Sequence, residues 1–465
     1  MRPHIIFSTL GVLLCLWSGG VIAKETSDPF GTEESLPLKP ALRLGGAVGD
    51  PCAEAMPAGA LDLLEVVNLA LCNNPQTREV WASSRAQAAQ VGVSKSGYLP
   101  GSSLSVSGNR NSPGTGLRSV GLTLSYLLYD FGTRAASVEN AQQLLAAANA
   151  TQDSTVQTVF LLAVQSFYQT QAAQAALTAA FESEHAAKES FSAAEARYRS
   201  GSATPADKLQ AQTAFSQATL NRITADGNLK NVTGNMANIL GLDANRNVTL
   251  VAANTAVVPV NFDRDVNVLI EEARLRRPDM QAAAAQVKAA QANVDAARAS
   301  GKPSISLNAS TNQTNSVGIT SHGSSVGVNL SVPIFSGYAP TYRIRAAEAQ
   351  VEVQAAQLEG LRLQVSLDVW TAYQNLITAT QSLRTTADLL NSAEQSERVA
   401  LGRYKAGVGS ILDVLNAQSA LAGARQQRIQ STLDWNISRA VLARAMGNLD
   451  ENLLQTLPGG TGQIP

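Results

Sequence analysis

Helical and strand-like patterns of hydrophobic residues alternate along this chain, and the whole order of patterns occurs twice. Segments 61–97 and 264–300 are rich in Ala and Gln and have the composition and spacing of helices. Pro75 and Pro278 lie near their starts, where a proline caps or divides the first turns of a helix. We therefore predict a helix in each segment, capped or divided at its proline.

A pair of alternating segments follows each of these helices. Apolar residues such as Leu104, Val106, Leu122 and Leu124 take every second position, and Ser, Thr, Asn or Gly takes most of the others. Alternation of this kind, with a polar loop between the two segments, is typical of a strand, a turn and a second strand. At about ten residues each, such strands are long enough to cross a membrane. The predicted strand pairs are 102–129 and 303–333.

Unusually long helices are predicted after the strand pairs, at 132–199 and 338–405. Neither has a proline in its interior, apart from Pro340 at the start of the second. At about 1.5 Å per residue, each would be a rod of roughly 100 Å. Each ends in a glycine-containing turn, and a helix of about half the length returns, at 204–240 and 410–446. Two short helices stacked end to end can therefore pair with each long one.

The two halves of the chain are copies of one unit. Pro75 corresponds to Pro278 at an offset of 203 residues, and Tyr198 corresponds to Tyr404 at an offset of 206. The second offset is kept by Gly201 with Gly407, Asp207 with Asp413, and Gly241 with Gly447. A constant offset over so many positions indicates an internal duplication.

The ends of the chain lie outside the two repeats. The first residues combine a basic start, an apolar stretch and a small residue before Lys24, as in a secretory signal peptide; a retained membrane anchor is the alternative. The predicted division is a signal peptide at 1–23, an extended N-terminal segment at 24–60, repeat 1 at 61–242, a linker at 243–263, repeat 2 at 264–447 and a flexible tail at 448–465.

Composition and charge exclude several classes of function. With 45% hydrophobic residues the chain is too apolar for a disordered protein, and a net charge of −1 gives no general attraction to nucleic acid. Beyond the signal peptide only His185 and His322 remain, and no catalytic motif or metal-ligand spacing occurs. We therefore predict no enzyme activity, no cofactor, no metal site and no nucleic-acid partner.

Two cysteines remain in the exported chain, Cys52 and Cys72. An oxidising compartment favours a disulfide between them, which would stabilise the protein by about 3 kcal/mol in the loop-entropy model. Two separate thiols are the alternative, because the sequence does not give the distance between the two Cα atoms.

The predicted strands raise the question of how their edges are paired. Lipid leaves no tolerance for an unpaired strand edge, and four strands are too few to enclose a lumen. If the strands cross a membrane, those of several chains must combine into one barrel. The alternative is a soluble sandwich with one polar face, although such a sandwich has no use for helices of this length.

Several motifs in both repeats resemble the TolC family of outer-membrane efflux and secretion ducts. They are LALCNNPQ with EEARLRRPD, the strand-to-helix junctions LLYDFGTR and VPIFSGY, and the turns RYRSGSATPADKLQAQ and RYKAGVGSILDVLNAQ. The resemblance covers the whole chain after the signal peptide and is most specific in the turns. It implies an α+β membrane protein of the outer membrane, in which an internally duplicated protomer gives four strands of a trimeric twelve-stranded β-barrel and a long α-helical periplasmic tunnel.

By this resemblance, the turns between the long and the returning helices form the periplasmic entrance. Tyr404 and Asp413 correspond to positions that line or latch the constriction of the family. Asn416 stands where many members have an acidic residue, and Gly409 where some have a basic one. An uncharged Asn416 puts in doubt a second ring of carboxylates and a strong preference for cations.

The repeat 1 equivalents at this entrance are Tyr198 and Asp207, and Gly201 and Gly407 mark the turns where an adaptor would dock. The same residues also have a structural interpretation, because glycine fits the positive φ that ends a helix, and a carboxylate in the first turn of the next helix is favoured by the helix dipole. A threefold axis would bring three copies of Asp413 together, which favours a role in the pore.

The predicted function is a passive exit duct of a tripartite efflux system, which conducts small-molecule or drug-like cargo to the exterior. Its partners would be two further copies of the chain, a periplasmic adaptor, an inner-membrane transporter and outer-membrane lipid. The alternatives are the outer-membrane component of a type I protein secretion system and, more distantly, a periplasmic coiled-coil scaffold. The sequence does not indicate the cargo.

Overall fold

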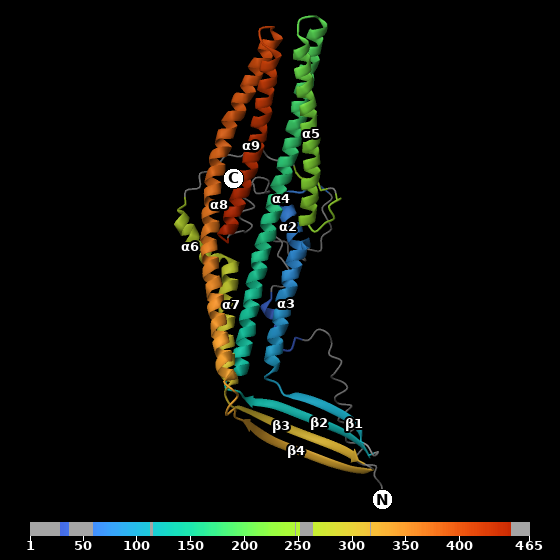
Figure 1. The fold of residues 1–465 in the computed structure, drawn as a ribbon, viewed down its shortest axis with the longest axis vertical. Helices are drawn as coiled ribbons and strands as arrows, with labels where there is room; N and C mark the ends of the chain where they lie inside the picture. Colours follow the sequence, from blue (N-terminus) through green and yellow to red (C-terminus); the bar gives the residue numbers. More distant parts are fainter. Residues whose placement is uncertain are drawn as a thin grey trace. The chain divides into compact units, whose positions relative to one another are not determined.

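The computed structural model describes residues 28–36, 59–111, 115–246, 248–251, 264–316 and 318–447 (Figure 1). The predicted signal peptide, the predicted tail and Cys52 lie outside these residues, as do most of the N-terminal segment and part of the linker. The chain divides into two compact units, unit 1 with residues 1–37, 84–145 and 291–347, and unit 2 with residues 38–83, 146–290 and 348–465. None of the described helices combines the length and the hydropathy that a membrane-spanning helix needs.

Both repeats contain the same elements in the same order. Repeat 1 has α2 (Leu63–Asn73), α3 (Pro75–Ser96), β1 (Gly101–Asn111), β2 (Thr115–Tyr129), α4 (Thr133–Arg199) and α5 (Pro205–Ile239). Repeat 2 has α6 (Val266–Arg276), α7 (Pro278–Ser300), β3 (Ser304–Ser316), β4 (Ile319–Ser331), α8 (Ala339–Lys405) and α9 (Ile411–Ala445). The long helices α4 and α8 have 67 residues each and the returning helices α5 and α9 have 35 each, close to the expected ratio of two to one.

The prolines divide the first helix of each repeat. Asn74, before Pro75, has φ −62° and ψ 130°, and Arg277, before Pro278, has φ −63° and ψ 127°. A residue before proline is pushed out of the helical region into extended backbone, so α2 and α6 end there. Proline then begins α3 and α7, where its missing N–H leaves no helical hydrogen bond unmade.

The described part of unit 1 contains an antiparallel sheet with the strand order β1-β2-β3-β4 (Figure 1). The register places Leu104 opposite Leu122 and Val106 opposite Val120, so the alternating apolar residues gather on one face. The apolar residues of this face, called the apolar face below, are Leu104, Val106, Val120, Leu122, Leu124, Tyr126, Ile305, Leu307, Ala309, Val326, Val328 and Leu330; toward the far ends of β3 and β4 the same face carries Thr311, Gln313, Asn315, Thr320, His322 and Ser324. Val106 is 73% exposed and Val326 is 78% exposed, so the described residues leave these parts of the face uncovered.

The opposite face of the sheet is polar. Its side chains include Ser103, Ser105, Ser107, Ser119, Thr123, Ser125, Asn308, Ser310, Asn312, Ser325 and Asn329. Opposed hydroxyls bond each other across the strands, at 2.7 Å between the Oγ atoms of Ser107 and Ser119 and at 2.9 Å between those of Ser310 and Ser325. The sheet therefore separates an apolar surface from one that can be hydrated.

An ion pair holds the junction between β2 and α4 in unit 1. The Asp130 carboxylate accepts from the backbone N–H of Arg134 at 2.9 Å and from its Nε at 3.1 Å. Arg134 also donates through Nη1 to the carbonyl of Gly97 at 3.1 Å, and its guanidinium lies 4.7 Å from the ring centroid of Tyr98. Both side chains of the pair are almost buried. One arginine thus links the start of α4 to the chain that enters β1.

The described part of the N-terminal segment differs from the extended chain predicted for it. Residues 33–35 form a short 3₁₀ helix, η1 (Glu33–Ser35). The segment lies against α3, since Lys95 Nζ donates to the carbonyl of Phe30 at 3.3 Å and Leu36 packs on a core that includes Ala88 and Val91. These contacts fix the segment to unit 1.

Each repeat has its own hydrophobic core in unit 2. The first core joins α2, α4 and α5 with Ala440 of α9, and its most deeply buried members include Val66, Phe167, Met236 and Leu240. The second core joins α6, α8 and α9, and its members include Leu269, Val369, Leu383 and Trp435. The duplication seen in the sequence is therefore also a duplication of packing.

The returning helices end against the breaks that the prolines create. A Cβ on Gly241, which has φ +71°, would lie 2.5 Å from the carbonyl oxygen of Asn73. A Cβ on Gly447, which has φ +73°, would lie 3.1 Å from the backbone nitrogen of Arg277. Glycine is needed at both positions because the backbone is left-handed there and another backbone comes this close.

Candidate functional site

The turn between α4 and α5 closes around Gly201, which has φ +76°. Its N–H donates to the carbonyl of Tyr198 at 3.0 Å, and the N–H of Ser202 donates to the carbonyl of Arg197 at 2.9 Å. These bonds satisfy the last carbonyls of α4 in the usual manner of a helix that ends in a left-handed glycine. The predicted structural role of Gly201 is confirmed.

The turn between α8 and α9 has the same geometry. Gly407 has φ +80°, its N–H donates to the carbonyl of Tyr404 at 3.1 Å, and Val408 donates to the carbonyl of Arg403 at 3.0 Å. A Cβ placed on Gly407, like one placed on Gly201, would meet no atom within 4 Å. Both turns are therefore open on the side of the glycine, and the glycines are needed for the backbone conformation alone.

The two predicted carboxylates, Asp207 and Asp413, both cap helices. The N–H of Asp207 donates to Oγ1 of Thr204 at 3.2 Å, and the N–H of Thr204 donates back to the Asp207 carboxylate at 2.9 Å. Asp413 and Ser410 form the same reciprocal pair, at 3.1 and 3.3 Å. The structural interpretation of both residues is confirmed, while a role in a pore remains a prediction.

The two equivalent tyrosines differ in their surroundings. Tyr404 is only 6% exposed and packs in a cluster with Ala194, Ala211, Ile411 and Val414, whereas Tyr198 is 41% exposed. The cluster takes residues from α4, α5, α8 and α9, so it joins the two helical hairpins near their turns. Repeat symmetry is broken at this point, and Tyr404 is the member that links the repeats.

Arg197, which the sequence analysis did not single out, contacts both the backbone and the ring of Tyr404. Its Nη2 donates to the Tyr404 carbonyl at 2.7 Å, and its guanidinium lies 4.0 Å from the centroid of the tyrosine ring. The carbonyl belongs to the last turn of α8, where the helix dipole favours a cation. The only sequence feature that could have drawn attention to Arg197 is that an Arg precedes a Tyr in both turns, as Arg197 precedes Tyr198 and Arg403 precedes Tyr404.

Charged residues surround the exposed tyrosine of repeat 1. Glu195 forms ion pairs with Lys208 and Arg199, each at 3.2 Å, and Lys208 Nζ lies 5.7 Å from the ring centroid of Tyr198. The hydrogen bond from Lys208 and the charge of Arg199 lower the pKa of Glu195. This end of the α4–α5 hairpin therefore keeps a carboxylate between two cations at neutral pH.

A groove of about 590 Å³ lies between α8 and α9 beside their turn. It is lined by Gln395, Ser396, Val399, Ala400, Arg403, Asp413, Asn416, Ala417 and Ala420. The structure thus brings two of the predicted gate residues, Asp413 and Asn416, into one groove with Arg403. The third, Tyr404, is not among the residues that line the groove.

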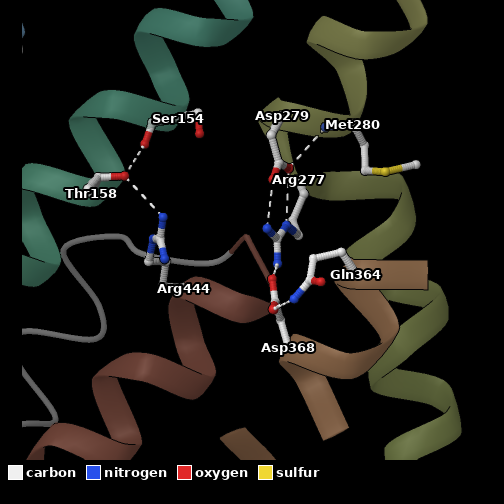
Figure 2. A network of polar contacts seen from close by, with 8 residues as sticks. All are labelled: Ser154, Thr158, Arg277, Asp279, Met280, Gln364, Asp368 and Arg444. Atoms are coloured by element: carbon white, nitrogen blue, oxygen red, sulfur yellow. Dashed lines mark hydrogen bonds and ion pairs between the residues drawn. The ribbon is translucent and has the colours of Figure 1, made fainter. Parts of the chain in front are cut away.

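A second polar cluster, shown in Figure 2, lies at the break between α6 and α7. Arg277 bonds the carboxylate of Asp279 through Nε at 3.0 Å and Nη2 at 2.6 Å, and that of Asp368 through Nη1 at 3.0 Å. Arg444 donates to Oγ1 of Thr158 at 3.1 Å. Burial raises the pKa of Asp279, but the bonds and charge of Arg277 outweigh burial and the net pKa is lowered. The cluster holds α7, α8 and the α6–α7 break together.

Cys72 is disulfide-bonded. The predicted partner, Cys52, lies outside the described residues, so the pairing of these two cysteines remains a prediction. Among the described residues no group of three or more His, Cys, Asp or Glu side chains is placed to hold a metal ion.

Comparison with known proteins gives matches over nearly the whole chain. A family model described as "Outer membrane efflux protein" matches residues 66–242 and 269–448, one segment in each repeat. Protein CyaE of Bordetella pertussis is 31% identical over 462 residues, which cover 96% of each chain. Outer membrane protein TolC of Vibrio cholerae is 25% identical over 415 residues, or 86% of this chain and 94% of the relative.

Solved structures show the same fold. A structure of CusC, described with the formation of a transmembrane channel, superimposes with a TM-score of 0.74 at 21% identity and covers 89% of this chain and 98% of that one. The predicted fold class, a duplicated protomer with four strands and long helices, is confirmed by this match.

Proposed function

The chain belongs to the outer membrane efflux protein family, and on this premise we propose that it is the exit duct of a tripartite efflux system that expels small-molecule or drug-like cargo. As a member of this family it is a duct of the cell outer membrane that extends into the periplasm. Beyond this family assignment, the proposal names the class of cargo, the partner proteins and the residues that form the periplasmic entrance.

One observation supports the duct function. The sheet has an apolar face and a polar face, and its two edge strands have no partner strand within the described chain. β1 pairs only with β2, and β4 only with β3. In lipid such edges must be paired, and four strands cannot close on themselves. Three copies would supply twelve strands, with the apolar face toward lipid and the Ser, Thr and Asn side chains toward a wet lumen.

The entrance of the duct is assigned to the turns of the two hairpins. Asp413 and Asn416 lie together in the groove beside the α8–α9 turn, and Tyr404 is held by the other repeat. In our proposal these three residues belong to the constriction. The open turns at Gly201 and Gly407 are the docking points of a periplasmic adaptor, which links the duct to an inner-membrane transporter.

Two other functions remain to be separated from this one by experiment. A type I protein secretion system would use the same duct for a polypeptide, and a periplasmic scaffold would use the helices without conduction. The family description favours efflux. Catalysis has no place in the proposal, because the energy for transport would come from the partner pump.

The cargo is tested in the natural host after deletion of the gene and complementation with the intact chain. Efflux predicts that the deletion strain accumulates a fluorescent amphiphilic dye, that complementation restores its expulsion, and that an adaptor and a transporter co-purify with the tagged chain. Normal dye expulsion with loss of one polypeptide from the medium would instead establish the secretion function.

A further inference from the structure

Positive charge is confined to one end of one face of the sheet. The four strands contain no Asp, Glu or Lys, and their arginines are Arg110 on β1 and Arg118 on β2. The register pairs Arg118 with Gly108 and Arg110 with Gly116. Residues two apart on a strand share a face. Both arginines therefore lie on the apolar face defined above, beyond Val106 and Val120 toward the turn between β1 and β2.

The two arginines are diagonal neighbours with open space between them. In an antiparallel pair, diagonal positions lie about 7–8 Å apart, within reach of long side chains. The residue directly opposite each arginine is a glycine, and a Cβ placed on Gly108 or on Gly116 would meet no atom within 4 Å. Both arginines are exposed. The strands therefore carry two exposed arginines, and the position directly opposite each of them has no side chain.

The neighbouring positions add neutral polar groups and no negative charge. Asn315 lies opposite Arg118 on β3, and its Nδ2 bonds Oγ1 of Thr320 at 3.0 Å. In the adjacent row Gln313 lies opposite His322. Nothing on these strands competes with an external anion for the arginines.

Repeat 2 provides an internal comparison. At the offsets of 203 and 206, Arg110 corresponds to Gln313 and Arg118 to Ser324. The strands of repeat 2 thus form the same sheet without either arginine. The pair is dispensable for the strand architecture, which points to a ligand that only repeat 1 binds.

The position of the two arginines along the lipid-facing surface indicates which ligand they bind. The apolar rows lie between the arginines and the helices, so the pair sits at the outer limit of the lipid-facing surface. An arginine on this face strongly destabilises a barrel at the midplane of a bilayer but costs little at the interface. Guanidinium groups also bind phosphate through two parallel N–H donors.

We propose that Arg110 and Arg118 form a binding site for the phosphate of a lipid headgroup in the outward-facing leaflet, with the anion above Gly108 and Gly116. The proposal rests on the assignment of the apolar face to lipid. It names a phosphorylated lipid as the occupant because the arginines are continuous with a surface that only acyl chains would cover.

The test uses the purified full-length assembly in detergent, with lipid adducts counted by native mass spectrometry. The probes are diphosphoryl lipid A, the same lipid without its phosphates, and inorganic phosphate. The double substitution Arg110→Gln with Arg118→Ser installs the residues of repeat 2. We expect binding of diphosphoryl lipid A to weaken by roughly tenfold for each arginine removed, and that of the phosphate-free lipid to stay unchanged.

Two further variants separate a built site from general attraction. Gly108→Val keeps both charges but fills the space between them, so it should also weaken binding of the phosphorylated lipid. Arg398→Gln removes one exposed positive charge from α8 and should leave binding unchanged. Circular dichroism and the mass of the assembly verify the fold of each variant.

Three results would overturn the proposal: equal lipid binding by the wild type and a folded double variant, unchanged binding by a folded Gly108→Val variant, or equal competition by inorganic phosphate. The conductance of the same preparations in phosphatidylcholine bilayers reports the duct separately. Loss of conductance in the wild type would refute the proposed function, whereas retained conductance with unaltered lipid binding by the double variant would refute this site alone.

Discussion

Arg197 on α4 donates a 2.7 Å hydrogen bond to the carbonyl of Tyr404 at the end of α8, across 207 positions of sequence. The same guanidinium lies over the tyrosine ring. Tyr404 also accepts at this carbonyl from the N–H of Gly407, so one oxygen serves both the turn and the link between hairpins. An outward movement of one hairpin that separates Arg197 from Tyr404 would therefore have to break this bond.

Arg197→Gln should therefore loosen the entrance. A hydrogen bond from a charged donor contributes about 1.5–3 kcal/mol, and a cation–π contact about 0.5–1 kcal/mol. We expect a lower unfolding temperature and a higher single-channel conductance of the purified protein. Arg398→Gln, at an exposed position of α8 outside the groove, is the control, and it should leave the Tyr404 link and the conductance unchanged. Equal conductance of the wild type and Arg197→Gln would exclude Arg197 from the gate.

Ser410 and Asp413 allow capping to be separated from gating. Ser410→Ala removes the side-chain acceptor of the cap but keeps the carboxylate, and each such loss costs about 1 kcal/mol. Asp413→Ala removes the carboxylate but keeps the Ser410 hydroxyl. We expect both variants to lower thermal stability and only Asp413→Ala to raise conductance. If the two variants change conductance equally, the carboxylate acts through the helix cap and has no place in the constriction.

The sequence predicted the elements of this fold more fully than the contacts between them. Period-two alternation around Leu104 and Val106 fixed both strands and faces, and the absence of interior prolines fixed the long helices to within a residue or two. Local patterns also reveal the glycine turns and the capping carboxylates, because these features depend on residues that are close in sequence.

The asymmetry between Tyr198 and Tyr404 could not be predicted in this way. Both follow an arginine and precede a glycine turn, yet only Tyr404 is buried. Which of the two is buried depends on the faces that α4 and α8 turn toward each other, and these are set by packing between repeats. The link from Arg197 is invisible in the sequence for the same reason.

Asp279 gives the protein an acid-sensitive contact. Its pKa is lowered in the folded state, so the ionised carboxylate contributes stability that is fully present above the unfolded pKa of about 3.9 and is lost as the pH falls through the lowered folded value. Asp279→Asn should reduce the unfolding temperature at pH 7 and flatten its dependence on pH below about 4. Asp388→Asn, at an exposed position of α8, should change neither. An unaltered pH profile in Asp279→Asn would contradict this assignment.

The disulfide of Cys72 is expected to join it to Cys52. Peptide mapping of the protein without reductant should recover one cross-linked fragment that contains both residues. Cys52→Ser should then expose one thiol at Cys72 to alkylation and lower stability by about 3 kcal/mol in the loop-entropy model. Recovery of Cys72 in a disulfide with a residue other than Cys52, or no new thiol in Cys52→Ser, would contradict the pairing.

The conductance of the purified protein in a planar lipid bilayer tests the central claim most directly. A duct built from the sheets and helices of three chains must conduct ions in the absence of any partner, with a small current while the entrance is held closed and a larger one in Arg197→Gln. Assemblies that are folded and inserted in the bilayer, yet carry no current in either form, would contradict the account.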